Sequence, residues 1–273
     1  MSRLAWGPIL EHAAAIVRSY DTGVTLRQLY YRLVADGTLV NSTGSYKALS
    51  SKTAEARRNG EFPDLIDLGR VIQRYETWAD PEAAVVDALR FYRRDRTEFQ
   101  DVSVYLGVEK KGIVAQLQSW FGDLGIPILA LGGYSSQTYV DDVAADVSGQ
   151  ARDAVLLYAG DFDPSGEDID RDFVRRTGCF EEVVRVALTA DQVSTYSLPP
   201  AIGKATDSRA GGFIARHGQL VQVELDALPP DVLRGLYAAA LEEFWDTSAY
   251  ERSVAVEQDD RGRLSRLVEG LAS

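Results

Sequence analysis

The stretch "DAVLLYAGDFDPSGEDI", residues 153–169, determines the fold class of this chain. It begins with an apolar run of strand length and passes into Asp161, Asp163 and a Pro-Ser-Gly turn. Three similar apolar, β-branched runs occur elsewhere, at residues 102–108, 126–133 and 183–189, and helical stretches such as 112–125 and 136–147 separate them. Alternation of apolar strands with helices predicts an α/β fold, with a mostly parallel sheet covered on both faces by helices.

The first 80 residues have a different pattern. Residues 9–20 form an amphipathic helix, Thr25 and Gln28 form a capping box that opens a second helix ending near Gly37, and residues 45–60 form a third. Residues 61–70 are expected to be an extended wing. Three short helices and a wing predict a winged-helix, DNA-binding domain over residues 1–80.

The rest of the chain divides into two parts. Residues 81–100 are charged and are expected to form a helical connector. Residues 101–273 hold the α/β domain and a C-terminal extension, which is expected to contain a long loop (197–219), a strand (220–225) and two helices.

Composition limits the classes of protein to be considered. A single cysteine excludes an internal disulfide, and two histidines argue against a histidine-built zinc site. No apolar run approaches the roughly 18 residues that span a bilayer, and the N-terminus lacks a signal-peptide pattern, so we expect a cytoplasmic protein without a membrane partner. The net charge of −12 is uneven: the first 100 residues carry 14 basic and 13 acidic residues, the other 173 carry 15 and 28.

Two adjacent tyrosines in "TLRQLYYRLV", residues 25–34, raise the question of a nucleophile. On a helix, Tyr30 falls on the apolar stripe, whereas Tyr31 falls outside it on the side of Arg27. A fixed positive charge favours ionisation of a phenol, and a guanidinium binds phosphate through two parallel hydrogen bonds. Tyr31 is therefore a candidate nucleophile toward a phosphodiester, with an ordinary surface tyrosine as the alternative.

Carboxylates follow two of the predicted strands. Glu109 follows the strand at 102–108, and Asp161 and Asp163 follow the strand within 153–161. Sites in open α/β sheets lie at these strand ends, and three hard carboxylates suit Mg²⁺ or Mn²⁺. The alternative is that the two aspartates only cap the turn at Pro164.

These motifs together resemble a known family. Glu109 with the Asp161-Phe162-Asp163-Pro164-Ser165-Gly166 segment looks like a Toprim domain. In order and spacing the set resembles the A subunit of DNA topoisomerase VI and its relative, the meiotic double-strand-break transesterase. That family places a winged-helix domain before Toprim and carries an Arg-acidic-aliphatic-Tyr-Tyr motif, which Arg27-Gln28-Leu29-Tyr30-Tyr31 resembles. The segments "VEKKGI" (108–113) and "GGYSSQT" (132–138) also resemble family segments, and the resemblance covers roughly residues 20 to 190.

The resemblance implies a function. Tyr31 would attack a DNA phosphate with help from Arg27 and leave a 5′-phosphotyrosyl break, while Glu109, Asp161 and Asp163 would hold Mg²⁺ or Mn²⁺. A homodimer would pair the tyrosine of one protomer with the metal site of the other. Gln28, Lys111 and Ser165 depart from the family pattern without removing a catalytic group. The chain has no ATPase motif, so ATP-driven strand passage would need a separate subunit.

Two other functions stay open. A Toprim nuclease would hydrolyse DNA or RNA through metal-activated water, and a DNA-binding or partner-binding module would use the fold only as a scaffold. Metal-dependent cleavage and a protein–DNA adduct distinguish the three.

Further residues are candidates for DNA contact or metal binding. Glu224 and Asp226 could add metal ligands or be structural. The candidate DNA contacts, each with an incidental surface charge as the alternative, are Arg57, Arg58, Lys110, Lys204 and Arg209.

Overall fold

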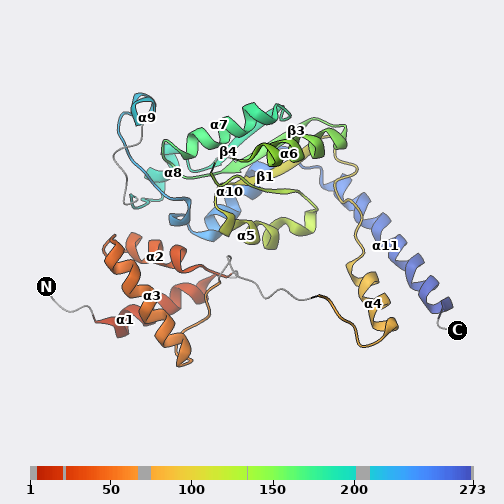
Figure 1. Ribbon diagram of the computed structural model, residues 1–273, viewed down its shortest axis with the longest axis horizontal. Coiled ribbons are helices and arrows are strands. Elements are labelled where there is room, and N and C mark those ends of the chain that lie inside the picture. The colour runs from red at the N-terminus through yellow and green to blue at the C-terminus, as the bar shows by residue number, and fades with distance from the viewer. Residues whose placement is uncertain (1–4, 21–22, 67–74, 134, 201–209, 272–273) are drawn as a thin grey trace.

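Four parallel strands form the centre of the larger part of the molecule (Figure 1). The computed structural model describes residues 5–20, 23–66, 75–133, 135–200 and 210–271. The strands are β1 (Ser103–Val108), β2 (Ile128–Ala130), β3 (Ala154–Ala159) and β4 (Glu182–Ala187), in the order β2-β1-β3-β4. All three pairings are parallel, with Val108 opposite Ala159 at the carboxyl ends of β1 and β3. The four predicted strands and the α/β class are confirmed.

Helices cover both faces of this sheet, as the continuous apolar strands predict. On one face α5 (Lys111–Phe121) and α10 (Pro230–Glu242) pack against strand residues such as Leu106 and Leu157. On the other face α6 (Gln137–Gln150) and α7 (Gly166–Thr177) pack against Tyr105 and Leu156. A 3₁₀ turn (Gly122–Leu124) follows α5, and α8 (Ala190–Thr195) follows β4.

The N-terminal helices are α1 (Trp6–Ser19), α2 (Leu26–Ala35) and α3 (Thr43–Arg58). The capping box at Thr25 is present, and α3 ends at Asn59, as predicted. Leu29, Leu33 and Leu49 are fully buried in an apolar core that continues into β1, β3 and α5. A buried amide pair adds a polar link, because Gln28 Nε2 donates to Gln116 Oε1 at 3.1 Å. These helices therefore pack directly on the α/β part of the chain.

The predicted wing is not formed in the part of it that can be described. Residues 61–66 form no strand, and residues 67–70 lie outside the described residues. Two backbone hydrogen bonds tie this segment to its neighbours: Glu61 N–H donates to Ala56 O at 2.9 Å, and Ile66 N–H donates to Val24 O at 3.1 Å. The winged-helix assignment of residues 1–80 therefore stays a prediction.

The C-terminal extension differs from its prediction at two places. The predicted loop 197–219 contains a helix, α9 (Ala210–His217), while residues 201–209 lie outside the described chain. The predicted strand 220–225 forms only one antiparallel bridge, between Val223 and Phe162. Its backbone then turns into a 3₁₀ helix, η2 (Leu225–Ala227), because the side chain of Asp161 accepts the Leu225 N–H at 2.8 Å. The Leu225 N–H thus bonds to a side chain and not to the backbone of a neighbouring strand.

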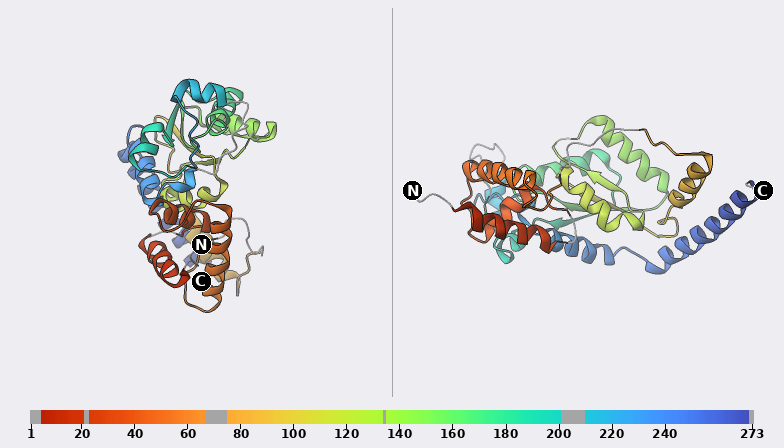
Figure 2. Two further views of the ribbon diagram at one scale, coloured as in Figure 1. Left: turned by 90° about the vertical axis from the view of Figure 1, so that its left-hand side faces the viewer. Right: turned by 90° about the horizontal axis from the view of Figure 1, so that it is seen from below.

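The connector and the C-terminal helix lie together at the end of the molecule away from α1–α3 (Figure 2). Residues Pro81–Phe91 form α4, so the predicted connector is helical only as far as Phe91, and eleven residues separate it from the start of β1 at Ser103. The long helix α11 (Thr247–Leu271) packs beside it. No helix within the described ranges is long and apolar enough to cross a bilayer.

Candidate functional site

The carboxylates at the ends of β1 and β3 are neighbours. Glu109 Oε2 accepts the backbone N–H of Asp161 at 2.8 Å, because the two strands pair in parallel and end together. Asp161 is only 6% exposed, and its two oxygens accept from Leu225 N–H (2.8 Å) and from Lys110 Nζ (2.5 Å). Burial, followed by the charge of Glu109, raises the pKa of Asp161 although Lys110 lowers it. Burial likewise raises the pKa of Glu109.

Asp163 has a different environment from Asp161. Its Oδ1 accepts the Gly166 N–H at 2.6 Å, which closes the turn before α7. This is the capping role at the Pro164 turn that the sequence left open as the alternative to metal binding. Gly166 has no side chain for a clear reason: a Cβ there would collide with the carbonyl oxygen of Asp161 and come within 3.3 Å of Glu109 Oε2. The backbone at Gly166 therefore lies close to the Glu109 carboxylate.

Lys110, one of the candidate DNA contacts, is half-buried and is paired with two carboxylates. Its Nζ lies 2.5 Å from Asp161 Oδ2 and 2.6 Å from Glu224 Oε2, and its side chain is 22% exposed. Burial opposes the charge on Lys110, but the two carboxylates outweigh burial and raise its pKa. The sequence gives no sign of this contact because Lys110 and Glu224 are far apart in the chain.

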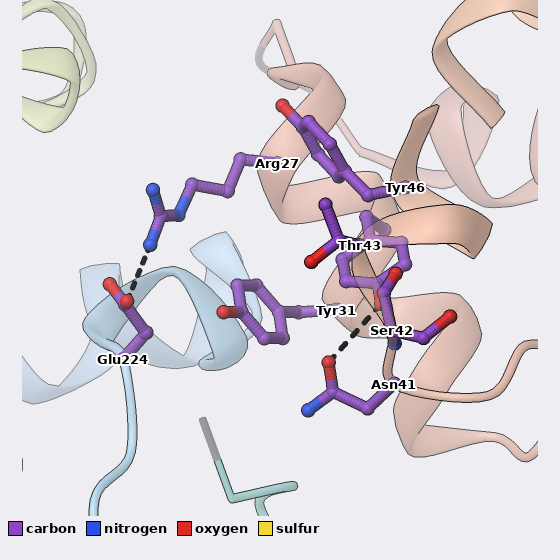
Figure 3. A pocket seen from close by; sticks show the side chains of 8 residues that line it. Arg27, Tyr31, Asn41, Ser42, Thr43, Tyr46 and Glu224 are labelled. Carbon is purple, nitrogen blue, oxygen red and sulfur yellow. Dashed lines mark hydrogen bonds and ion pairs between the residues drawn. The ribbon is translucent and has the colours of Figure 1, made fainter. Parts of the chain in front are cut away.

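A pocket of about 270 Å³ lies beside this ionic cluster, between α2, the start of α3 and the segment before η2 (Figure 3). In Figure 3 the phenol of Tyr31 points toward the segment that carries Glu224, and the side chain of Arg27 reaches across to the same carboxylate. The pocket is lined by Arg27, Tyr30, Tyr31, Asn41, Ser42, Thr43, Tyr46 and Glu224.

Tyr31 is more buried than its position on the helix predicts. It is 7% exposed: Tyr30 packs edge-on against it at 5.4 Å between ring centroids, and η2 packs against α2. Burial, and then the charge of Glu224, raises the pKa of Tyr31 even though Arg27 lowers it. Arg27 therefore acts in the expected direction, but burial and Glu224 outweigh it, so the pKa of this phenol lies above its ordinary value.

Arg27 lies beside Tyr31 as predicted, with its guanidinium carbon 5.9 Å from the centre of the Tyr31 ring. Its fork already has partners: Nη2 lies 2.5 Å from Glu224 Oε1 and Nε lies 3.2 Å from Asp226 Oδ2. Burial opposes the charge, but these carboxylates raise the pKa of Arg27. Glu224 and Asp226 therefore belong to the site as partners of Arg27, which the sequence alone left undecided.

Tyr30 has a structural role. Its hydroxyl accepts the Ser42 N–H at 2.7 Å and lies 3.1 Å from Asn41 Oδ1. It therefore fixes the start of α3 against α2. Ser42 in turn caps α3, because its Oγ accepts the Ser45 N–H at 3.1 Å.

The fit of these residues to a divalent ion can be judged from the same contacts. Carboxylates are the right donors for Mg²⁺ or Mn²⁺. However, Glu109 and Asp163 each use one oxygen on a backbone N–H, and Lys110 is the cation that lies against Asp161. Among the described residues, no group of three His, Cys, Asp or Glu side chains is arranged to hold a metal ion. The predicted set Glu109, Asp161 and Asp163 does not fit a metal in this arrangement.

The remaining candidates lie elsewhere. Arg57 is half-buried near the end of α3, where its Nε donates to Thr53 O at 3.4 Å, and Arg58 is exposed beside it. Lys204 and Arg209 lie outside the described residues. Arg57 and Arg27 both line a second, adjacent pocket of about 330 Å³.

Comparison with protein-family models, with curated proteins and with solved structures finds no match to this chain.

Proposed function

We propose that this chain cleaves DNA strands by attack of Tyr31 on a backbone phosphate, the activity that its motifs resemble. One observation supports the proposal most directly. A single pocket brings together the phenol of Tyr31, the guanidinium of Arg27 and the first residues of α3. These three groups come from two helices, and each has a use in binding or attacking a phosphate.

Apart from Glu224, which also lines the pocket, its polar groups are ones that bind anions. The N-terminus of a helix carries a partial positive charge, and α3 is 16 residues long. Ser42 and Thr43 line the pocket at that terminus, opposite the guanidinium of Arg27. Arginine hydrogen-bonds phosphate oxygens through its planar fork, so a phosphodiester beside Tyr31 would be bound from two sides.

The reaction is a transesterification. The Tyr31 oxygen forms a bond to phosphorus, the bond from phosphorus to the 3′-oxygen breaks, and a 5′-phosphotyrosyl link remains. The phenolic proton leaves to water, and the 3′-oxygen takes a proton from water. Arg27 stabilises the charge on the phosphate oxygens, which rises as the tyrosine attacks.

The metal ion, the homodimer and a separate ATPase subunit stay predictions of the resemblance. If Mg²⁺ or Mn²⁺ binds, Glu109, Asp161 and Asp163 are the residues to hold it after a rearrangement, and the ion would supply neutralisation of phosphate charge. The described arrangement does not fit the ion, so the steps above use only the side chains of the chain itself.

The test is plasmid cleavage by wild type, Tyr31→Phe and Tyr30→Phe. Samples contain Mg²⁺, Mn²⁺ or a chelator, are stopped with detergent, and are run with and without protease. We expect wild type and Tyr30→Phe to leave protein on the 5′ end and Tyr31→Phe to leave none. Tyr30→Phe loses only its hydrogen bonds to the start of α3, which costs about 1 kcal/mol of stability.

The other outcomes identify the alternatives. If both wild type and Tyr31→Phe cleave DNA and neither forms an adduct, the nucleophile is water, and the protein is a hydrolytic nuclease. An adduct that persists in Tyr31→Phe and disappears in Tyr30→Phe would show that Tyr30, and not Tyr31, is the nucleophile. If the protein binds DNA but does not cleave it under any of the ionic conditions, the binding-module alternative is the one supported.

A further inference from the structure

We propose that the carboxylate of Glu224 holds the place of a DNA phosphate, and that a phosphodiester binds between Arg27 and Lys110 when it displaces Glu224. This inference rests on the proposed function, since it takes DNA as the ligand. It gives Lys110, a candidate DNA contact from the sequence, a specific phosphate to bind, and it makes Glu224 an internal competitor of the substrate.

The first support is the convergence of two cations on one carboxylate. Arg27 Nη2 lies 2.5 Å from Glu224 Oε1, and Lys110 Nζ lies 2.6 Å from Glu224 Oε2. Each oxygen of Glu224 thus takes one cation. The cations come from α2 and from the start of α5, so the fold brings them together from parts of the chain 83 residues apart.

The second support is the match between a carboxylate and a phosphodiester. Both carry one negative charge shared by two oxygens, and both accept paired hydrogen bonds from arginine. Exchange of one for the other leaves the charge between Arg27 and Lys110 unchanged. The other partners of the cations can stay in place, because Asp226 holds Arg27 through Nε and Asp161 holds Lys110 through Oδ2.

The third support is the position of Glu224. Its side chain is 21% exposed and lines the pocket of Tyr31, so DNA can reach it from that side. The side chain of Asp226, which binds the same guanidinium, is 11% exposed and does not line that pocket. Of the two carboxylates on Arg27, Glu224 is therefore the one that a phosphate beside the phenol would replace.

The substitution that tests the proposal is Glu224→Gln, which keeps the shape of the side chain and removes its charge. All binding is measured in a Tyr31→Phe background, so that cleavage does not disturb equilibrium. The probe is a short fluorescent DNA duplex, followed by anisotropy over a series of salt concentrations. Glu251→Gln is the matched control, because Glu251 is exposed on α11 and its loss changes net charge equally.

We expect Glu224→Gln to bind the duplex roughly five- to tenfold more tightly at low salt, because two cations lose their internal partner. The dependence of log K on log salt should steepen by about 0.9, because one more phosphate is neutralised. Adding Arg27→Gln and Lys110→Gln to Glu224→Gln should abolish the gain. Glu251→Gln should bind as the parent does.

A second measurement does not depend on DNA. Inorganic phosphate should raise the melting temperature of Glu224→Gln more than that of the parent, because ligands that bind only the folded state stabilise it. The proposal is overturned if Glu224→Gln binds DNA no more tightly than Glu251→Gln, or if the gain survives loss of both cations. If Glu224→Gln binds more tightly but Tyr31 forms no adduct, the phosphate site stands and the proposed cleavage falls. If the adduct forms without any gain in Glu224→Gln, only the present inference falls.

Discussion

At the scale of single residues, the decisive feature is a phenol in an environment that keeps it protonated. Burial first, and Glu224 second, raise the pKa of Tyr31, while Arg27 lowers it. A phenol whose pKa lies above its ordinary value of about 10 has little phenolate at neutral pH. The nucleophile therefore becomes more abundant as pH rises, which gives the proposed reaction a definite pH dependence.

We expect the rate of adduct formation in a single turnover to rise about tenfold per pH unit between about pH 7 and 9, with no plateau. Glu224→Gln should raise the rate at each pH, because it removes a charge that disfavours the phenolate. Rates of the Tyr30→Phe variant serve as the control, since Tyr30 is not the attacking group. A plateau near pH 7 would contradict the assignment of a Tyr31 phenol with a raised pKa.

At the scale of elements, the end of the molecule formed by α4 and α11 depends on one buried carboxylate. The side chain of Glu257 on α11 is 3% exposed and binds Arg96 through both oxygens, at 2.8 and 3.0 Å. Its second oxygen also accepts the Arg94 N–H at 3.2 Å. The hydrogen bond and charge of Arg96 lower the pKa of Glu257. This contact joins α11 to the segment between α4 and β1.

Glu257→Gln should lower the free energy of unfolding by about 2 kcal/mol at pH 7, because a charged hydrogen-bond acceptor is replaced by a neutral one. A carboxyl with a lowered pKa stabilises the fold above its unfolded pKa of about 4.3 and loses that effect as pH falls toward the folded pKa. The difference between wild type and variant in urea unfolding should therefore shrink as pH falls below about 4.3. Glu251→Gln, exposed on the same helix, should stay within about 0.5 kcal/mol of wild type. An equal loss in both variants, or a gap that persists at low pH, would contradict the role of Glu257.

Elements were predictable from the sequence where a local pattern determines them. The four apolar runs became strands, and the Thr25 capping box opened α2 as expected. Residues 220–225 have the apolar pattern of a strand, yet they form one bridge, because Asp161 takes the backbone N–H of Leu225. A partner 64 residues away decided that outcome, and no local pattern contains it.

The site shows the same limit. The pairing of Tyr31 with Arg27 and the position of Glu109 beside Asp161 follow from helix and sheet periodicity, and both are present. The partners of Arg27 and Lys110 do not follow, because Glu224 reaches them only after α2, α5 and η2 pack together. The burial of Tyr31 was missed for the same reason. Periodicity predicts the apolar face of α2, but it does not predict that η2, from a distant part of the chain, packs against the same helix.

At the scale of the whole molecule, the tyrosine and the carboxylates of one chain are joined. Arg27, beside Tyr31, binds Glu224; Glu224 binds Lys110; and Lys110 binds Asp161. The apolar core also runs without interruption from α2 into β1 and β3. The resemblance implies instead that the tyrosine of one protomer meets the carboxylates of the other. The contacts within one chain favour a site completed in cis.

Mixing a variant that lacks the nucleophile with a variant of the predicted metal site distinguishes these arrangements. Tyr31→Phe lacks the nucleophile and keeps the carboxylates, whereas Asp163→Asn keeps the nucleophile and the acceptor for Gly166 N–H but loses a carboxylate charge. Each is first shown to be inactive alone, and the two are then refolded together in equal amounts so that mixed dimers form. With a site completed in cis, no chain in the mixture carries both groups, and we expect supercoiled plasmid to stay intact. With a site completed in trans, a mixed dimer has one whole site and would cut one strand, so nicked plasmid carrying covalent protein would contradict the cis arrangement. Wild type mixed with Tyr31→Phe is the control for exchange, because it should nick in either case if chains exchange between dimers.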